Sequence, residues 1–126
     1  RQQLAHETVA VLESGAYTLP DGRAVSVRAA LDACLAATRF LPPKELARLK
    51  YDVLAAPPRF GVTKIEVRNE TTLAGCGREV ATAGGEPVVA LNFASARNPG
   101  GGFLNGSEAQ EESLARSSGL YASLLQ

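Results

Sequence analysis

The sequence of 126 residues is poor in the side chains that bind metals or form disulfides. Its two cysteines, Cys34 and Cys76, are far apart, and His6 is its one histidine. This set cannot form a Cys-x-x-Cys motif or a zinc-binding cluster. Two free thiols are the ordinary state of a protein in a reducing cytosol. The sequence therefore predicts a cytoplasmic protein without a disulfide framework, with His6 on its surface.

Net charge and long apolar segments are also absent. The 13 lysines and arginines balance 13 aspartates and glutamates, so the formal net charge is zero. The basic surface that holds long nucleic acid is therefore missing. The apolar runs are short, such as residues 88–91, and predict neither a transmembrane helix nor a signal peptide. With 45% hydrophobic and 21% charged residues, the composition is that of one small folded domain.

The N-terminal part of the sequence has the pattern of a helical extension. Gly15 suits the left-handed end of a first helix, Ser26 has the chemistry of an N-cap, and Pro43 suits a first helical turn. The predicted elements are helix 1–14, a brief strand at 24–25, helix 27–38 and a third helix from Pro43. We therefore assign residues 1–58 to an N-terminal helical extension.

The pattern changes after residue 58 to that of an α/β core. Residues 62–67 alternate apolar and polar side chains, as a strand near an edge does. Residues 69–72 have loop and helix-cap chemistry, and we expect a helix from there to about residue 82. Residues 88–94 are apolar on both faces, which is typical of a buried parallel strand. Strand, helix and strand in this order predict one right-handed βαβ unit.

A glycine-rich segment follows the second predicted strand and leads into a final helix. Ser107 and Gln110 have the spacing of a capping box, which predicts a helix over 108–124. Two substantial strands are too few for an α/β sheet, which usually has about five. We therefore expect residues 59–126 to be the N-terminal half of the core, with the remainder of the domain beyond residue 126. Residues 1–126 alone are expected neither to fold stably nor to be active.

The residues suited to chemistry gather around this glycine-rich segment. Three consecutive glycines lie just past the predicted second strand, where α/β sheets bind ligands. Seven residues later, a glutamine and two glutamates occupy the first turns of the final helix. Backbone N–H groups there suit an anion such as a pyrophosphate, and two carboxylates can bind sugar hydroxyls and move a proton. The residues are Gly100, Gly101, Gly102, Gln110, Glu111 and Glu112.

Each part of this pattern also has a purely structural explanation. Three glycines can form a flexible loop, and glutamate is favoured at a helix start by about 0.3–1 kcal/mol. The conjunction of triple glycine, seven-residue spacer, capping box and Gln-Glu-Glu after a buried strand is hard to obtain from packing needs alone. The whole pattern therefore favours a functional site.

The pattern resembles the signature of the poly(ADP-ribose) glycohydrolases, a catalytic branch of the macrodomain fold. Residues 88–103 and 111–121 look like bacterial-type members, and the helical preamble is similar to the N-terminal extension of that branch. The resemblance implies a three-layer α/β/α fold, of which only the first part of the sheet is present in this chain. It also implies hydrolysis of the ribose–ribose O-glycosidic bond of poly(ADP-ribose), with release of ADP-ribose and without a metal or cofactor.

The resemblance also implies roles for individual residues. Glu112 would be the catalytic acid and base, and Glu111 and Gln110 would hold the ribose that flanks the scissile bond. The glycines at 100–102 would let the backbone pass close to the distal ribose, with Asn98 as a polar contact beside it.

Glu70 is a further candidate, at some distance in sequence. It follows the first predicted strand, where other macrodomains have an acidic residue that reads adenine. The alternative is that the segment around Glu70 only caps a helix.

Two other functions are compatible with the same fold. A non-catalytic macrodomain would bind ADP-ribose without cleaving it, and a related hydrolase would remove mono-ADP-ribose from a protein or nucleobase. The pair Glu111 and Glu112 favours catalysis, because a pure reader needs no acid. The expected partners are poly(ADP-ribose), ADP-ribose, ADP-ribosylated proteins and the C-terminal remainder of the same protein. Direct binding to membranes or nucleic acid is not expected.

Overall fold

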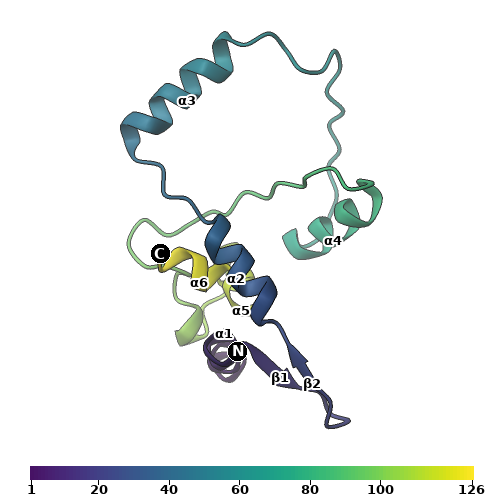
Figure 1. The fold of residues 1–126 in the computed structure, drawn as a ribbon, viewed down its shortest axis with the longest axis vertical. Coiled ribbons are helices and arrows are strands. Elements are labelled where there is room, and N and C mark those ends of the chain that lie inside the picture. Colours follow the sequence, from purple (N-terminus) through teal and green to yellow (C-terminus); the bar gives the residue numbers. More distant parts are fainter. The chain divides into compact units, whose positions relative to one another are not determined.

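The computed structural model describes all 126 residues, which form two compact units. One unit joins Arg1–Thr38 to Glu70–Gln126, and the other is Arg39–Asn69. The elements of the first unit are α1 (Gln2–Ser14), β1 (Ala16–Thr18), β2 (Ala24–Ser26), α2 (Arg28–Ala37), α4 (Thr72–Thr82), the 3-10 helix η1 (Phe103–Asn105), α5 (Gln110–Ser117) and α6 (Leu120–Leu124) (Figure 1). The second unit contains α3 (Pro43–Ala55).

The N-terminal elements follow local sequence signals closely. Gly15 ends α1 in the left-handed conformation with φ 72°, as predicted, and its N–H donates to the carbonyl of Val11 at 2.8 Å. The strands β1 and β2 then form an antiparallel hairpin, of which the sequence predicted only the second strand. Ser26 pairs in β2, and the N-cap of α2 is Val27 without a side-chain hydrogen bond. The prediction of Ser26 as the cap is therefore wrong by one residue.

The core of the first unit brings the N-terminal helix onto the glycine-rich segment. Ala5 of α1, Phe103 of η1 and Ala115 of α5 are 0%, 1% and 0% exposed and form one cluster. Tyr121 packs on this cluster, with its ring centroid 4.8 Å from that of Phe103 in an edge-to-face arrangement. The helix α1 therefore supports the segment that holds the candidate site.

The two predicted core strands do not form a sheet within this chain. Only β1 and β2 are paired, and residues 62–67 and 88–94 follow extended paths without strand hydrogen bonds (Figure 1). Val67 is 95% exposed and Val89 is 91% exposed. A strand is completed by hydrogen bonds to a neighbouring strand, and neither segment has such a neighbour among residues 1–126. The helix of the predicted βαβ unit is therefore formed, and its two strands are not paired within residues 1–126.

That connecting helix, α4, begins and ends as predicted. Thr71 is its N-cap, and the Thr71 hydroxyl accepts a hydrogen bond from the N–H of Ala74 at 3.2 Å. The helix continues through Gly75 and Gly77 to Thr82. A good cap and the following turn are enough to fix its ends in spite of the two glycines.

The final predicted helix, 108–124, is broken into α5 and α6. Ser118 is extended between them, and its hydroxyl donates to the carbonyl of Leu114 at 2.7 Å and accepts from the N–H of Leu120 at 3.2 Å. The predicted capping box is also absent, because the N-cap of α5 is Ala109 and makes no side-chain hydrogen bond. The side chain of Gln110, which the capping box needs, is engaged elsewhere.

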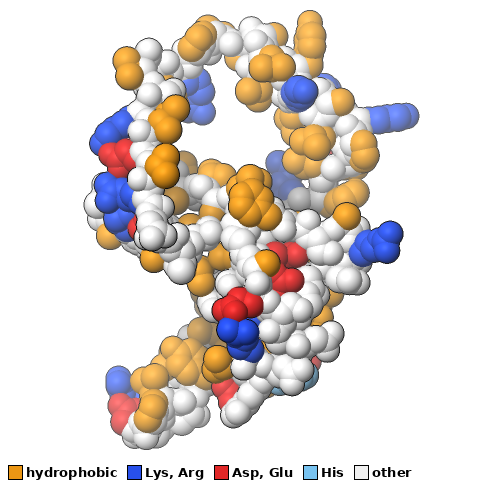
Figure 2. Space-filling model, turned by 180° about the vertical axis from the view of Figure 1, so that it is seen from behind, with side chains coloured by type: hydrophobic (Ala, Val, Ile, Leu, Met, Phe, Trp, Pro, Cys, Tyr) orange, Lys and Arg blue, Asp and Glu red, His pale blue; other side chains and the backbone are white.

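The second unit contains no buried residue. Its helix α3 begins at Pro43 as predicted, but Leu46 and Val53 on its apolar stripe are 56% and 71% exposed. Hydrophobic side chains are prominent on the face of the chain drawn in Figure 2. The predicted boundary at residue 58 stays a prediction.

Candidate active site

The three glycines form a tight turn just before η1. Gly100 and Gly101 have φ values of 73° and 60°, a left-handed conformation that glycine adopts without strain. The N–H of Gly101 donates to the carbonyl of Asn98 at 2.9 Å, and the N–H of Ser107 returns to the carbonyl of Gly102 at 3.1 Å. The chain therefore folds back on itself over residues 98–107.

Gly101 lies between the two glutamates of α5. A Cβ atom at Gly101 would lie 2.8 Å from Cδ of Glu112 and 3.3 Å from Oε2 of Glu111. The helical rotation of about 100° per residue separates the two side chains, yet the loop brings one backbone position next to both carboxyl groups. The triple glycine and the Gln-Glu-Glu sequence thus meet in space, as predicted.

Glu112 is only partly buried, and one of its oxygens is bound by the loop. Oε1 accepts from the N–H of Gly102 at 3.1 Å. This hydrogen bond is the main reason why the pKa of Glu112 lies below its usual value of 4.5, with smaller contributions from the backbone N–H groups of Glu112 itself and Ala109 at the start of α5, and from the charge of Arg116. Burial acts in the opposite direction. Glu112 is therefore ionised at neutral pH in this structure.

Glu111 is 3% exposed, and it is the buried charged residue of the chain. Its Oε2 accepts from the N–H of Ser95 at 2.7 Å, and its Oε1 accepts from the N–H of Gly100 at 3.1 Å. Both oxygens are thus hydrogen-bonded to backbone, which compensates for burying the charge. The prediction that Glu111 holds a ribose stays a prediction.

The side chain of Gln110 is bonded to the extended segment before the loop. Its Oε1 accepts from the N–H of Phe93 at 2.8 Å, and its Nε2 donates to the carbonyl of Leu91 at 2.7 Å. Nε2 also lies 3.2 Å from the hydroxyl of Thr72 in α4. Its predicted contact with a ribose likewise stays a prediction.

Asn98 is exposed at the beginning of the turn. Its N–H donates to the hydroxyl of Ser95 at 3.1 Å, and the N–H of Arg97 does so at 3.3 Å. The sequence interpretation missed Ser95, although a serine followed by Ala-Arg-Asn-Pro has the chemistry of a side-chain-stabilised turn. Ser95 thus shapes the turn on which Asn98 is presented.

Arg116 is a second residue that the sequence interpretation missed. Its guanidinium donates to the carbonyl of Ser107 at 2.6 Å, and its own carbonyl accepts from the hydroxyl of Thr8 in α1 at 2.6 Å. Arg116 stands four residues after Glu112, so the helical spacing alone could have indicated its effect on that carboxylate. It links the turn, the catalytic candidate and α1.

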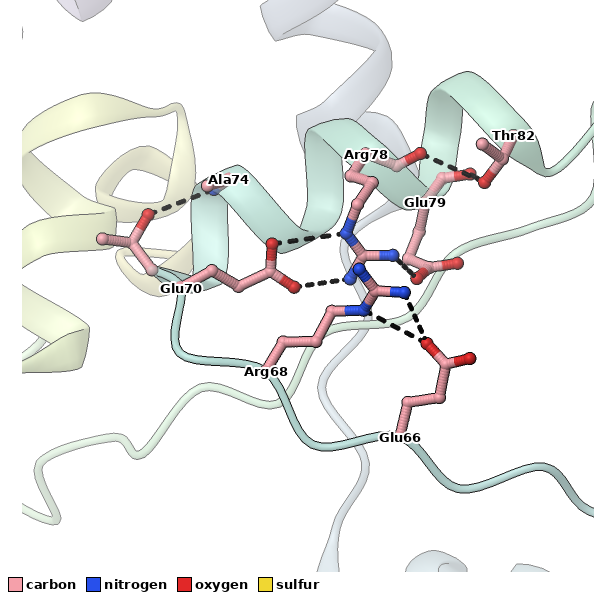
Figure 3. A network of polar contacts seen from close by, with 8 residues as sticks. Glu66, Arg68, Glu70, Ala74, Arg78, Glu79 and Thr82 are labelled. Carbon is pink, nitrogen blue, oxygen red and sulfur yellow. Dashed lines mark hydrogen bonds and ion pairs between the residues drawn. The ribbon is translucent and has the colours of Figure 1, made fainter.

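Glu70 is bound to α4. Its carboxylate binds the guanidinium of Arg78 in α4, with one contact of 3.3 Å from Nε, and Arg78 also binds Glu79 (Figure 3). Glu70 and then Glu79 raise the pKa of Arg78. The N-cap of α4 is Thr71, the residue after Glu70. The adenine-binding role of Glu70 stays a prediction.

A cavity lies elsewhere in the first unit. It has a volume of about 870 Å³ and is lined by side chains of α1, β1 and α2 and by the chain from Arg116 to Gly119. Neither the glycine loop nor Glu111 and Glu112 line it. No group of three or more His, Cys, Asp or Glu side chains is placed to hold a metal ion. No helix has the length and apolar character needed to cross a membrane.

Comparison with known proteins places this geometry in a family. A family model described as the microbial-type PARG catalytic domain matches residues 5–126. The chain is 50% identical to a crystal structure of poly(ADP-ribose) glycohydrolase (PARG) from Thermomonospora curvata, with a TM-score of 0.86. The match covers 98% of this chain and 44% of that one, and it confirms that this chain is a fragment of an α/β fold.

Two further structures of the Thermomonospora curvata glycohydrolase are similar. One is bound to the inhibitor ADP-HPD, with 49% identity and a TM-score of 0.82. The other has one glutamate replaced by alanine, with 48% identity and a TM-score of 0.81. Each match covers 98% of this chain and 43% of that chain, so this chain spans less than half of its solved relatives. A search of curated proteins found no match.

Proposed function

This chain belongs to the microbial-type PARG catalytic-domain family, as its signature predicted, and we propose that the protein hydrolyses poly(ADP-ribose). The bond broken is the ribose–ribose O-glycosidic bond, and the product is ADP-ribose. The proposal is supported by a relative described as poly(ADP-ribose) glycohydrolase at 50% identity. A second structure of that relative binds the inhibitor ADP-HPD.

One observation about Glu112 carries the proposal. Of the two carboxylates beside Gly101, Glu111 is buried with both oxygens hydrogen-bonded, and Glu112 is partly exposed with one oxygen held by Gly102. A general acid must reach the substrate with an oxygen that carries or accepts a proton. Glu112 is therefore the carboxyl group that meets this requirement, and it serves both steps of the reaction.

In the first step, protonated Glu112 gives its proton to the glycosidic oxygen as the bond from that oxygen to C1 of the distal ribose breaks. The electron pair of the bond leaves with the oxygen, and the substrate pyrophosphate stabilises the resulting oxocarbenium ion. In the second step, the Glu112 carboxylate removes a proton from water as the water oxygen bonds to C1. Glu112 regains its proton, and the net reaction is hydrolysis. Many glycosidases divide these roles between two carboxylates about 5–9 Å apart, whereas here one group performs both.

Bound substrate changes the pKa of Glu112. The N–H of Gly102 lowers the pKa of Glu112 in the free site, which favours the ionised form. The negative charges of a bound pyrophosphate would raise that pKa, because like charges disfavour ionisation. Bound substrate would therefore favour the protonated form of Glu112, which the first step needs. Gly100 and Gly102, with Gly101 between them, let the backbone approach the distal ribose, and Asn98 offers it a polar contact.

The finer assignments belong to the same proposal. The extended apolar segments at 62–67 and 88–94 are strands of a macrodomain sheet that further chain of the same protein completes, since both are exposed here. We assign residues 1–58 to the helical extension and residues 59–126 to the N-terminal half of that macrodomain. Glu70 contacts the adenine. The protein is a bacterial, cytoplasmic enzyme that acts on poly(ADP-ribose) attached to proteins.

Two alternatives share the fold. A reader would bind ADP-ribose without turnover, and a mono-ADP-ribosyl hydrolase would release single units from a protein or nucleobase. The partly exposed carboxyl of Glu112 beside the loop favours hydrolysis over simple binding, since a reader has no use for an acid.

The test is release of ADP-ribose from automodified polymer by the full-length enzyme and its Glu112→Gln variant. The amide keeps the shape of Glu112 and cannot transfer a proton, so turnover should fall by about 10⁴-fold or more, with ADP-ribose binding retained. Glu108→Gln is the matched control, because Glu108 is exposed and pairs with Arg1 outside the loop. Residual activity above a few per cent, or polymer left uncleaved by the wild type, would contradict the proposal.

A further inference from the structure

We infer that Arg116 is a positioning residue for the proposed reaction, because it ties the turn after the glycines to α5 and so holds the carboxyl group of Glu112 in place. This role rests on the proposed function, in which Glu112 is the acid and base. Arg116 transfers no proton itself. It acts through residues 102–107, the turn that joins the glycines to the start of α5.

A closed ring of hydrogen bonds begins and ends on α5. The guanidinium of Arg116 donates to the carbonyl of Ser107 at 2.6 Å. The N–H of Ser107 donates to the carbonyl of Gly102 at 3.1 Å, and the N–H of Gly102 donates to Oε1 of Glu112 at 3.1 Å. Glu112 and Arg116 are four residues apart on one helix, so their side chains lie on the same face. The ring therefore attaches the turn to this face at two points.

The turn needs this attachment because its other contacts leave its orientation free. The carbonyl of Gly102 also accepts from the N–H of Asn105 at 3.0 Å, a bond that shapes the turn without joining it to α5. Phe103 packs against Ala115 of α5, but an apolar contact has no preferred direction. The hydrogen bonds at Gly102 and Ser107 are directional, so they decide where the N–H of Gly102 points.

The helix α1 holds the backbone of Arg116. The hydroxyl of Thr8 donates to the carbonyl of Arg116 at 2.6 Å, closer than its 2.9 Å contact with the carbonyl of Leu4 in its own helix. The carbonyl of Arg116 is in the last turn of α5, where carbonyls have no partner within the helix. The side chain of Gln2 donates to the carbonyl of Asn105 in the turn at 3.2 Å. Thus α1 supports both the turn and the residue that anchors it.

The charge of Arg116 by itself would have the opposite effect on the reaction. The hydrogen bond from Gly102 is the main cause of the low pKa of Glu112, and the positive charge of Arg116 adds a smaller decrease. Removing this charge would raise the pKa and favour the protonated acid that the first step needs. A loss of turnover on removal of the guanidinium would therefore report the position of Glu112 and not its charge.

The test compares Arg116→Met with Arg116→Lys in the full-length enzyme. Methionine keeps an unbranched apolar stem without a donor, whereas lysine keeps one donor for the carbonyl of Ser107. The Nε of Arg116 is buried without a hydrogen-bond partner, so lysine loses no contact there. On polymer, kcat should fall by about 10- to 100-fold in Arg116→Met, the cost of misplacing a reacting group by about 1 Å. Arg116→Lys should exceed Arg116→Met by at least about threefold, because the contact uses one nitrogen and no bidentate geometry.

The affinity for ADP-ribose, measured by calorimetric titration, separates positioning from binding. It should change by less than about threefold in Arg116→Met, because the reacting group is displaced and not removed from a contact with the ligand. Arg23→Met is the matched control, since Arg23 is exposed and pairs with Asp21 in the hairpin, and it should keep the wild-type kcat. The inference fails if kcat is unchanged in Arg116→Met, if the lysine and methionine variants lose kcat equally, or if affinity falls as much as kcat.

Two substitutions at Thr8 keep the test decisive where Arg116→Met fails to fold. Thr8→Val keeps the shape of the side chain and removes the hydroxyl, whereas Thr8→Ser keeps the hydroxyl. Loss of this hydrogen bond should lower kcat by about three- to tenfold in the valine variant, with the serine variant near wild type. Equal kcat values in the two variants would overturn the inference.

Hydrogen exchange of single backbone amides, measured by NMR on the ligand-free full-length enzyme, tests the ring without substrate. The amides of Gly102 and Ser107 should exchange about tenfold faster in Arg116→Met, because the turn opens more often without its anchor, and they should slow again in Arg116→Lys. Wild-type rates at both amides in Arg116→Met would contradict the role of Arg116. A wild-type enzyme that cleaves no polymer, with both amides protected in the wild type and exposed in Arg116→Met, would defeat the proposed function alone.

Discussion

The chain around the glycine loop and the unit Arg39–Asn69 differ in how deeply they bury their apolar and charged side chains. Near the loop, Phe103 is 1% exposed and the charged Glu111 is 3% exposed. In the other unit, Ile65 and Val67 are 83% and 95% exposed, although both are apolar. Burial thus follows the availability of a partner and not the polarity of the residue.

The difference comes from where each region finds its hydrogen bonds. Turns and helices close most of their hydrogen bonds within a few residues, and the glycine turn, η1 and α5 are elements of this kind. An extended segment has its N–H and C=O groups directed sideways and needs another strand. The loop region is therefore complete from contacts within the chain, whereas residues 62–67 are not.

The largest effect is expected for phenylalanines that differ in burial between the two regions. Phe103→Ala in the full-length enzyme should lower the free energy of unfolding by about 3–5 kcal/mol, because it empties the core between Ala5 and Ala115. Phe40→Ala, at a side chain 84% exposed, should change it by less than about 0.5 kcal/mol. Urea unfolding measures both. A Phe40 effect as large as that of Phe103 would show that the two regions are equally packed in the whole enzyme.

A second prediction sharpens the comparison with two glycines in the same backbone conformation. Gly101 and Gly22 have φ values of 60° and 86°, but a Cβ at Gly22 would meet nothing within 4 Å. Gly101→Val should weaken ADP-ribose binding by about tenfold or more, since its side chain displaces the carboxyl of Glu112. Gly22→Val should cost about 1–2 kcal/mol of stability through strain alone and leave affinity unchanged. Calorimetric titration with ADP-ribose is the measurement, and unaltered affinity in Gly101→Val would reduce the glycines to a plain loop.

A third prediction concerns the charge on Glu112, which the loop stabilises. The folded-state pKa lies below the usual 4.5, so folding favours the ionised carboxyl. The corresponding stability is present above pH 4.5 and is lost as the pH falls through the lower, folded-state pKa, with the dependence of a single proton. Glu112→Gln lacks this contribution. Urea midpoints of the wild type and the variant should therefore approach each other in acid, and a constant gap from neutral pH to acid would contradict this.

The smallest expected effect is at Glu70, outside the loop. Glu70→Gln should weaken ADP-ribose binding by about fivefold or less, because the change replaces one charged hydrogen bond by a neutral one. Glu79→Gln is the matched control, since Glu79 shares the partner Arg78 and should leave affinity unchanged. Equal affinities in the two variants would remove Glu70 from the adenine site.

Local signals allowed much of the fold to be predicted. Gly15 ends α1, Pro43 begins α3 and Thr71 caps α4 because each acts through its own few neighbours. The break at Ser118 was missed, because a serine inside a helical pattern gives no sign that its hydroxyl will bond on both sides. The two predicted core strands do not pair within residues 1–126, because pairing depends on a partner strand that no local pattern supplies.

The proximity of the glycines to Glu111 and Glu112 was predictable from the sequence, whereas the arrangement of the side chains was not. The roles of these residues stay predictions. The spacing brought the glycines together with Gln110, Glu111 and Glu112. Helical angles could not tell which glutamate turns inward, because that depends on backbone N–H groups 11 and 16 residues earlier. The capping box failed for the same reason, since Gln110 bonds to residues 17 and 19 positions away.

Because α1 contacts α5, the candidate site can form only late in the synthesis of the chain. The hydroxyl of Thr8 binds the carbonyl of Arg116, 108 residues later. At ribosomal rates of about 5–20 residues per second, α1 exists for roughly 5–20 s before its partner is made. Closing so long a loop is slow compared with forming a helix or a turn. During that interval Ala5 and Val9 of α1 lack Phe103 and Ala115, the residues they later pack against. The glycine turn is therefore supported by α1 only after residues 103–115 have left the ribosome.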